Sequence, residues 1–249
     1  MILKDFHIHT NYCDGKHSPR DIISAAISQG MNEIGILCHS YMDFDQSYCI
    51  KKDQIENFKT EISALKSEYK DKIKILCGVE QDYFSRESTE GFDYVIGAVH
   101  YVKKDGKYLD VDLSEEMFVN YVKTFYGGDF LAFCEDYFKL VGEIYEKTSP
   151  DIIAHFDLVT KFNQDSKWFD TNDSRYLDAA KKAIDKLIVY DKPFEINTGA
   201  ISRGYRNDPY PEKNLIEYIK EKGGKLILSS DSHSKDTLLY KFNEYEHLI

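Results

Sequence analysis

Short apolar runs alternate with amphipathic segments along most of the chain. The apolar runs predict β-strands over residues 2–9, 33–39, 73–80, 94–100, 151–155, 194–197 and 225–231. Hydrophobic residues three or four positions apart predict helices over residues 19–29, 53–69, 173–190 and 211–222, and one or two more over 114–148. Strands that alternate with helices are typical of a parallel sheet, and this number of units favours an α/β barrel over an open sheet.

Turn and capping residues support these boundaries. Ser18 followed by Pro19 is the pattern of an N-cap and a first helical residue. Gly30 and Gly223 stand where two of the predicted helices end, and a Gly127-Gly128 pair breaks the segment 114–148. With no linker or repeat in view, we expect one domain over residues 1–249.

The predicted strands end in residues that bind metals or transfer protons. They are His9, His39, Glu80, His100, His155, Asn197 and Asp231, with His233 two positions later. Parallel barrels build their sites where the carboxyl ends of the strands meet. Six of the chain's eight histidines lie at or next to this rim, so the sequence predicts a site there.

Composition and charge restrict the classes of partner that we expect for the protein. A formal net charge of −11 argues against a nucleic-acid partner, which requires a basic face. No apolar run approaches the length of a membrane span, so we expect no membrane partner. Five cysteines without a CxxC pair favour a reducing cytoplasmic location. The sequence carries no signal of oligomeric state.

The first strand offers the densest group of ligand atoms. Asp5, His7 and His9 are spaced by two, so a β-strand turns them to one face, while Phe6 and Ile8 turn towards the helices. An isolated pair of histidines is as often a core feature as a metal site. Imidazoles and carboxylates at the other strand ends favour zinc, iron or manganese. They outnumber the ligands of one tetrahedral ion, so more than one cation is expected, with a carboxylate such as Glu80 as the bridge.

Seven segments carry a resemblance to a known family. In order they are DFHIHT, which a later Asp-Gly follows in CDG, then CHS, GVEQDY, DYVIGAVHY, IIAHFDLVTKF, EINTGAISRG and SSDSH. In order and spacing the chain resembles the polymerase-and-histidinol-phosphatase (PHP) superfamily, and most of all its stand-alone histidinol-phosphatases. The resemblance implies a distorted seven-stranded barrel, similar to a TIM barrel, with a trinuclear metal site at the carboxyl ends of the strands.

The resemblance also implies which residues hold two or three divalent ions. The first ion would be bound by His7, His9, Glu80 and Asp231. The second would be bound by His39 and His233 with either Asp14 or His17, and the third by His100, His155 and the shared Glu80. Cys38 is a departure, because relatives commonly have an aspartate before the motif histidine.

Such a site implies a metal-dependent phosphomonoester hydrolase. Clustered divalent cations neutralise the phosphate and generate a hydroxide that attacks phosphorus in line with the leaving oxygen. Arg203 stands where the family has a phosphate-binding arginine, with Arg206 and Lys161 as further candidates. The general acid stays open between His39 and a metal-bound water.

The expected substrate is a small phosphomonoester. The resemblance implies hydrolysis of L-histidinol phosphate in histidine biosynthesis. The alternative is another PHP phosphoesterase, acting on nucleotide, sugar or tyrosine phosphates. Substrate choice would lie in loops 43–52 and 103–116, where Asp43 or Asp45 could pair with a substrate ammonium group.

Overall fold

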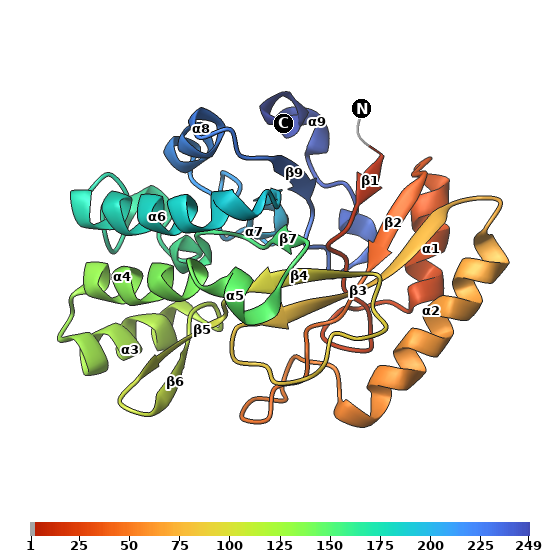
Figure 1. Cartoon of the computed structure of the whole chain (residues 1–249), viewed down its shortest axis with the longest axis horizontal. Helices are drawn as coiled ribbons and strands as arrows, with labels where there is room; N and C mark the ends of the chain where they lie inside the picture. Colours follow the sequence, from red (N-terminus) through yellow and green to blue (C-terminus); the bar gives the residue numbers. More distant parts are fainter. Residues whose placement is uncertain (1–2) are drawn as a thin grey trace.

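Seven parallel strands form a nearly closed barrel that helices surround (Figure 1). The computed structural model describes residues 3–249, so Ile2, at the start of the first predicted strand, lies outside the described part. The strands, in their order around the sheet, are β1 (Lys4–Asp5), β2 (Glu33–Ile36), β3 (Lys74–Asp82), β4 (Tyr94–Ala98), β7 (Ile152–Ile153), β8 (Phe194–Asn197) and β9 (Leu226–Ser229). The predicted barrel and its seven strands are confirmed.

The barrel closes between its first and last strands through a few hydrogen bonds. The amide of His9 donates to the carbonyl of Ser232 at 2.8 Å, and the amide of Ser232 donates to the carbonyl of His7 at 3.0 Å. Nearer the strand starts, the buried Asp5 carboxylate accepts from the amide and the hydroxyl of Ser230. Asp5 therefore joins the two edge strands through its carboxylate.

The helices follow the predicted pattern closely. They are α1 (Pro19–Ser28), α2 (Ile55–Tyr69), α3 (Glu115–Tyr126), α4 (Phe130–Val141), α5 (Ile144–Thr148), α6 (Ser174–Leu187), α7 (Gly199–Ser202), α8 (Lys213–Glu221) and α9 (Phe242–Tyr245). The Ser18 hydroxyl caps α1 by accepting from the amide of Asp21 at 3.2 Å. Gly127 and Gly128 adopt φ values of 62° and 89° and separate α3 from α4. The segment 114–148 thus holds three helices, where one or two were expected.

The segment predicted as a loop at 103–116 is partly a β-hairpin. Strands β5 (Tyr101–Lys104) and β6 (Lys107–Asp110) pair antiparallel, with Tyr101 opposite Asp110. The amide of Val111 then donates to the carbonyl of His100 at 2.9 Å. The hairpin therefore returns the chain to the end of β4, beside His100.

The barrel interior is filled by apolar side chains below the strand ends. Tyr94 lies across two glycines, Gly35 and Gly78, where a Cβ atom would overlap its ring or hydroxyl. The Tyr94 hydroxyl donates to the carbonyl of Phe6 at 2.6 Å. Phe6 itself packs edge-on against Tyr94, whereas Ile8 packs among α1 and α2. The prediction that both residues face the helices is wrong for Phe6, because regular strand geometry ends at Asp5.

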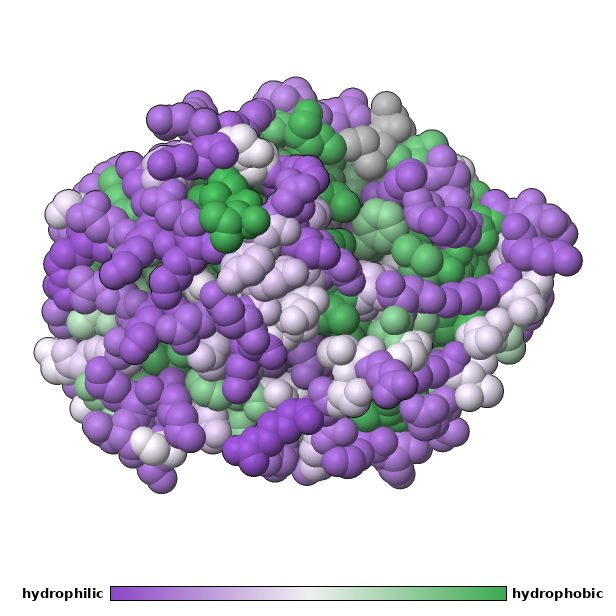
Figure 2. Space-filling model, viewed as in Figure 1, coloured by the Kyte–Doolittle hydropathy of each residue, from purple (hydrophilic) through white to green (hydrophobic). Residues whose placement is uncertain are grey.

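The outer surface agrees with the acidic composition. Figure 2 shows hydrophilic side chains over most of one face, with hydrophobic groups visible in the gaps between them. Among residues 3–249, no helix is long and apolar enough to cross a membrane.

Replacement of Gly78 by alanine tests the interior packing. The added Cβ would meet the Tyr94 ring, so the variant Gly78→Ala should lose about 1–3 kcal/mol of unfolding free energy in urea denaturation. Gly142→Ala is the control, because the nearest atoms lie 3.2 Å from its added Cβ and a smaller loss is expected. Equal stability of Gly78→Ala and wild type would contradict this packing.

Candidate metal centre

A single buried carboxylate, Glu80, lies at the centre of the predicted site. It is 1% exposed and stands on β3, two positions beyond Gly78 on the inward face. Its Oε2 atom lies 3.3 Å from His7 Nε2, 3.5 Å from His9 Nε2 and 2.8 Å from His39 Nδ1. Three imidazoles from two strand ends therefore converge on one carboxylate oxygen.

The other oxygen of Glu80 faces a second pair of imidazoles. Its Oε1 atom lies 3.0 Å from His155 Nε2 and 3.4 Å from His100 Nε2. These histidines follow β7 and β4, the next two strands of the barrel. The carboxylate thus stands between two groups of nitrogen atoms, as a bridging ligand does.

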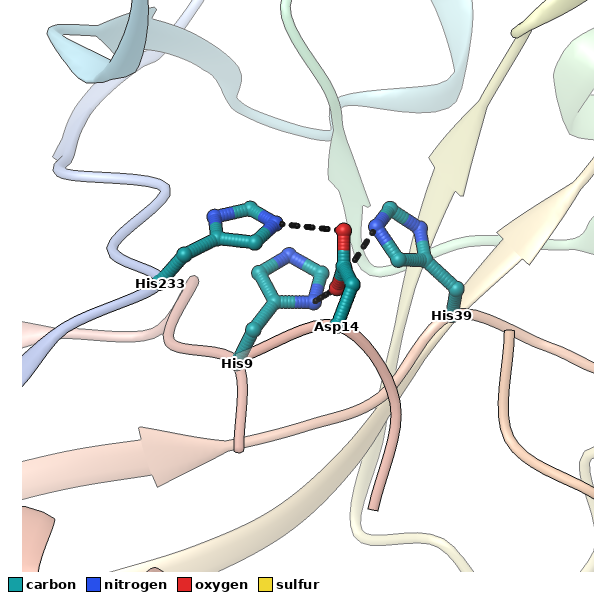
Figure 3. A group of neighbouring side chains, drawn as sticks. All are labelled: His9, Asp14, His39 and His233. Atoms are coloured by element: carbon teal, nitrogen blue, oxygen red, sulfur yellow. Dashed lines mark ion pairs between the residues drawn. The ribbon is translucent and has the colours of Figure 1, made fainter. Parts of the chain in front are cut away.

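Asp14 organises a third group at the rim (Figure 3). Its carboxylate lies 3.2 Å from His233 Nε2, 3.6 Å from His39 Nε2 and 3.8 Å from His9 Nδ1. The turn can fold this closely because the next residue is Gly15, where a Cβ would lie 2.8 Å from the carbonyl oxygen of His9. The glycine after Asp14 therefore positions this carboxylate.

Asp231 completes the arrangement and holds Arg203. Its Oδ1 atom lies 3.4 Å from His9 Nε2 and 3.6 Å from His7 Nε2. Arg203 donates to Asp231 Oδ2 at 3.0 Å and to the Asp231 carbonyl at 2.9 Å. A Cβ at Gly199 would lie 2.8 Å from both Arg203 and Asp231, so only glycine allows this approach. Asp231 adopts a φ of 47°, in the left-handed region that non-glycine residues adopt uncommonly.

The donor set fits divalent cations. Buried atoms without a hydrogen-bond partner include His7 Nε2, His9 Nε2, His39 Nδ1 and Glu80 Oε2, which all face one another. Unpaired buried polar atoms are costly, and here they are the nitrogen and oxygen atoms that zinc, iron or manganese bind. Three overlapping groups have ligand atoms within 4.8 Å of one another: His7, His9 and Glu80; His39, Glu80 and His100; and His9, Asp14, His39 and His233.

Electrostatic coupling within the cluster is strong. Burial alone would lower the pKa of His7, but the carboxylates of Glu195, Glu80 and Asp231 raise it well above its usual value. Burial would raise the pKa of Glu80, but the nearby imidazoles lower it well below its usual range. The carboxylates therefore favour a proton on His7, and a cation that binds there must displace it.

Two orienting carboxylates were not identified from the sequence. Glu195 on β8 is 1% exposed, and its Oε1 lies 2.7 Å from His7 Nδ1. Asp82 on β3 lies 3.2 Å from His100 Nδ1 and also accepts from the His100 amide at 3.0 Å. Each fixes the ring nitrogen that faces away from Glu80. The available signal was spacing, because Asp82 lies two positions after Glu80 on the same strand face.

Three other predicted residues have protein partners of their own. His17 Nδ1 accepts from the Lys235 amide at 3.3 Å, and His17 belongs to none of the three ligand groups. Lys161, only 9% exposed, donates to the Asp112 carbonyl at 2.6 Å and to its carboxylate at 3.0 Å. Arg206, 5% exposed, donates to Thr160, Asp208 and Glu212. Of the three predicted cations, Arg203 has the most accessible side chain, at 30%.

A cavity of about 240 Å³ opens over the cluster. Its walls include Asp14, His39, His100, His155, Arg203 and Lys161, whereas Arg206 and His17 are not among them. The volume lies below the range of most drug-sized ligand pockets and suits a small substrate.

Comparison with known proteins relates this site to a family. A sequence model of the PHP domain matches residues 5–199. A Schizosaccharomyces pombe protein named as a probable histidinol-phosphatase is 28% identical over 232 residues, which cover 86% of this chain and 74% of that protein.

Two crystal structures have the same fold. A Listeria monocytogenes protein assigned as a histidinol phosphatase has a TM-score of 0.86 at 20% identity, covering 97% of this chain and 99% of its own. The histidinol phosphate phosphatase of Lactococcus lactis, solved with zinc, L-histidinol and phosphate, has a TM-score of 0.70 at 24% identity, covering 99% and 92%.

Loss of the charge on Glu195 tests its orienting role. The variant Glu195→Gln keeps the size of the side chain but removes the carboxylate that faces His7 Nδ1. We expect about 10- to 100-fold weaker binding of zinc, measured by competition with a chelating dye. Glu217→Gln, an exposed position on α8, should bind zinc like wild type. Unchanged affinity of Glu195→Gln would show that His7 needs no such support.

Proposed function

The chain belongs to the PHP domain family, and from this premise we propose that it is a histidinol-phosphatase. It would hydrolyse L-histidinol phosphate to L-histidinol and phosphate in histidine biosynthesis, as one domain over residues 1–249. The observation that carries the proposal is the convergence of imidazoles on both oxygens of Glu80 beneath a small cavity. The names of the relatives support the substrate.

We propose that the cluster holds two or three divalent ions, which are zinc, iron or manganese. His7, His9, Glu80 and Asp231 would hold one ion, His39, His233 and Asp14 a second, and His100, His155 and Glu80 a third. We choose Asp14 over His17 because its carboxylate faces His233 and His39. When bound, such ions neutralise the phosphate and activate water as a nucleophile at neutral pH.

The residues of the chain would supply orientation and charge. Arg203 would bind the phosphate from the cavity wall, because Asp231 fixes its guanidinium through two donor nitrogens. Lys161 would act on the phosphate only at longer range, since Asp112 already neutralises it. Arg206 would stabilise the loops that it joins. His39 faces Glu80 through Nδ1 and Asp14 through Nε2. We propose that the His39 ring nitrogen that binds no cation donates the proton to the leaving oxygen.

The expected partners follow from the same features. A small phosphomonoester would be the only substrate, with no nucleic-acid or membrane partner, because the chain is acidic and its cavity is small. The cysteines are free thiols in the described residues, which suits the cytoplasm that we propose as the location.

The direct test is phosphate release from a panel of phosphomonoesters by metal-loaded protein. We expect L-histidinol phosphate to have the highest kcat/KM in the panel. Release from simple esters with no turnover of L-histidinol phosphate would refute the substrate but retain the chemistry. If the protein hydrolysed none of the esters in the panel, the proposed activity would be refuted.

Removal of a central imidazole should lower metal content and activity together. The variant His9→Ala removes a ring that faces Glu80, Asp231 and Asp14 at once. We expect lower metal content by elemental analysis together with loss of turnover. His247→Ala, at an exposed position near the end of the chain, is the matched control and should behave like wild type. Full activity of His9→Ala would contradict the ligand assignment.

Removal of Arg203, the arginine in the cavity wall, should lower activity without lowering metal content. We expect Arg203→Ala to retain its metal content and to lower kcat/KM by about 10- to 100-fold, since a hydrogen bond between charged groups is lost. Arg20→Ala, which removes an exposed arginine paired with Glu68, should change neither property. Equal loss of metal and activity in Arg203→Ala would instead assign Arg203 to support of Asp231.

A further inference from the structure

Asp110 lies in the wall of the cavity, outside the metal cluster. It is the last residue of β6 and pairs with Tyr101, the residue after His100. The same cavity wall includes Arg203, the residue proposed to bind phosphate. The β5–β6 hairpin therefore brings a carboxylate to the space that the substrate would occupy.

One oxygen of Asp110 is engaged and the other is not. Its Oδ1 accepts from the amides of Asp112 at 2.8 Å and Leu113 at 2.7 Å. Among residues 3–249, no side chain forms an ion pair or a hydrogen bond with Oδ2. The other cavity carboxylates do have such partners, since Asp112 pairs with Lys161 and Asp231 with Arg203.

The lack of a cationic side chain beside Asp110 among the described residues affects the pKa of its carboxyl group. Burial, reinforced by the neighbouring Asp112, raises the pKa of Asp110 to about 7. A carboxylate in a partly enclosed cavity is stabilised by a positive charge, and no cationic side chain of the described residues pairs with this one.

A tyrosine, Tyr48, lies in the wall of the same cavity. The hydroxyl of Tyr48 is buried and lies beside the hydroxyl of Tyr101. Tyr48 lines the cavity, and its ring contacts His39 edge-on, with centroids 4.8 Å apart.

We propose that Asp110 binds the ammonium group of the substrate. The inference rests on the proposed function and assigns to its site a residue that would select the amino-alcohol part of the substrate. In L-histidinol phosphate the ammonium-bearing carbon is bonded to the carbon that carries the phosphate ester. A group that binds the ammonium must therefore lie beside the phosphate site, and Asp110 lies next to His100.

The two aspartates that the sequence suggested for this role are placed elsewhere. Asp43 is exposed, and neither Asp43 nor Asp45 lines the cavity. The Asp45 carboxylate accepts from the amide and hydroxyl of Ser47 and from the hydroxyl of Tyr101. Asp45 therefore supports the cavity wall, and Asp110 is the carboxylate that remains open.

The test replaces Asp110 by asparagine, which keeps an acceptor oxygen for the turn at Asp112 and Leu113. The matched control is Asp105→Asn, which removes the same charge from an exposed position in the same hairpin. Three substrates are compared: L-histidinol phosphate, its deamino analogue and p-nitrophenyl phosphate. Binding of L-histidinol, which has no phosphate, is measured by calorimetry.

We expect Asp110→Asn to lower kcat/KM for L-histidinol phosphate by about 10- to 100-fold, mainly through KM. Turnover of the two esters without an ammonium group should change by less than about twofold, because the lost hydrogen bond is absent there. L-Histidinol should bind about 10-fold or more weakly to Asp110→Asn and normally to Asp105→Asn.

Two results would overturn the ammonium site. One is an equal loss with all three esters, and the other is unchanged binding of L-histidinol to Asp110→Asn. A failure of the proposed function is distinguishable from both, because it is a wild-type protein that hydrolyses no ester. In that event the calorimetric comparison still decides whether Asp110 binds the ammonium group.

Discussion

The arrangement depends on one buried charge, the carboxylate of Glu80. Burial of a carboxylate that is 1% exposed is costly unless other groups compensate its charge, and five imidazoles face its two oxygens. The imidazoles come from the ends of β1, β2, β4 and β7, so the charge can be compensated only when the barrel has closed. The site therefore forms only in the closed barrel, and the closed barrel is in turn favoured when the site residues compensate the charge of Glu80.

The rest of the scaffold limits where these groups can move. Glu195 and Asp82 fix the outer nitrogens of His7 and His100, and glycines at positions 15 and 199 allow the two rim carboxylates to approach closely. Such support matters because a metal site functions only when its ligands are held in place before the cation binds. The acidic exterior does not oppose an anionic substrate, since cations and Arg203 would set the potential inside the cavity.

The sequence predicted the barrel and its rim because one apolar strand after another ends in a histidine or a carboxylate, and parallel strands bring those ends together. It missed Glu195, which lies inside a short apolar strand and looks like any strand residue until His7 is seen beside it. It placed Phe6 on the wrong face, because strand alternation assumes regular geometry where β1 has already ended. It placed substrate choice in the loop 103–116 but did not identify Asp110, because only the tertiary pairing of β5 with β6 brings this residue to the cavity.

The central claim is that each oxygen of the Glu80 carboxylate would help to hold a divalent cation. The most direct measurement is anomalous diffraction from crystals of zinc-loaded protein, with data collected on both sides of the zinc absorption edge. The account predicts one anomalous peak between Glu80 Oε2 and His7, and another between Oε1 and His155. A map without peaks at the Glu80 carboxylate, from crystals whose protein is shown to contain zinc, would contradict it.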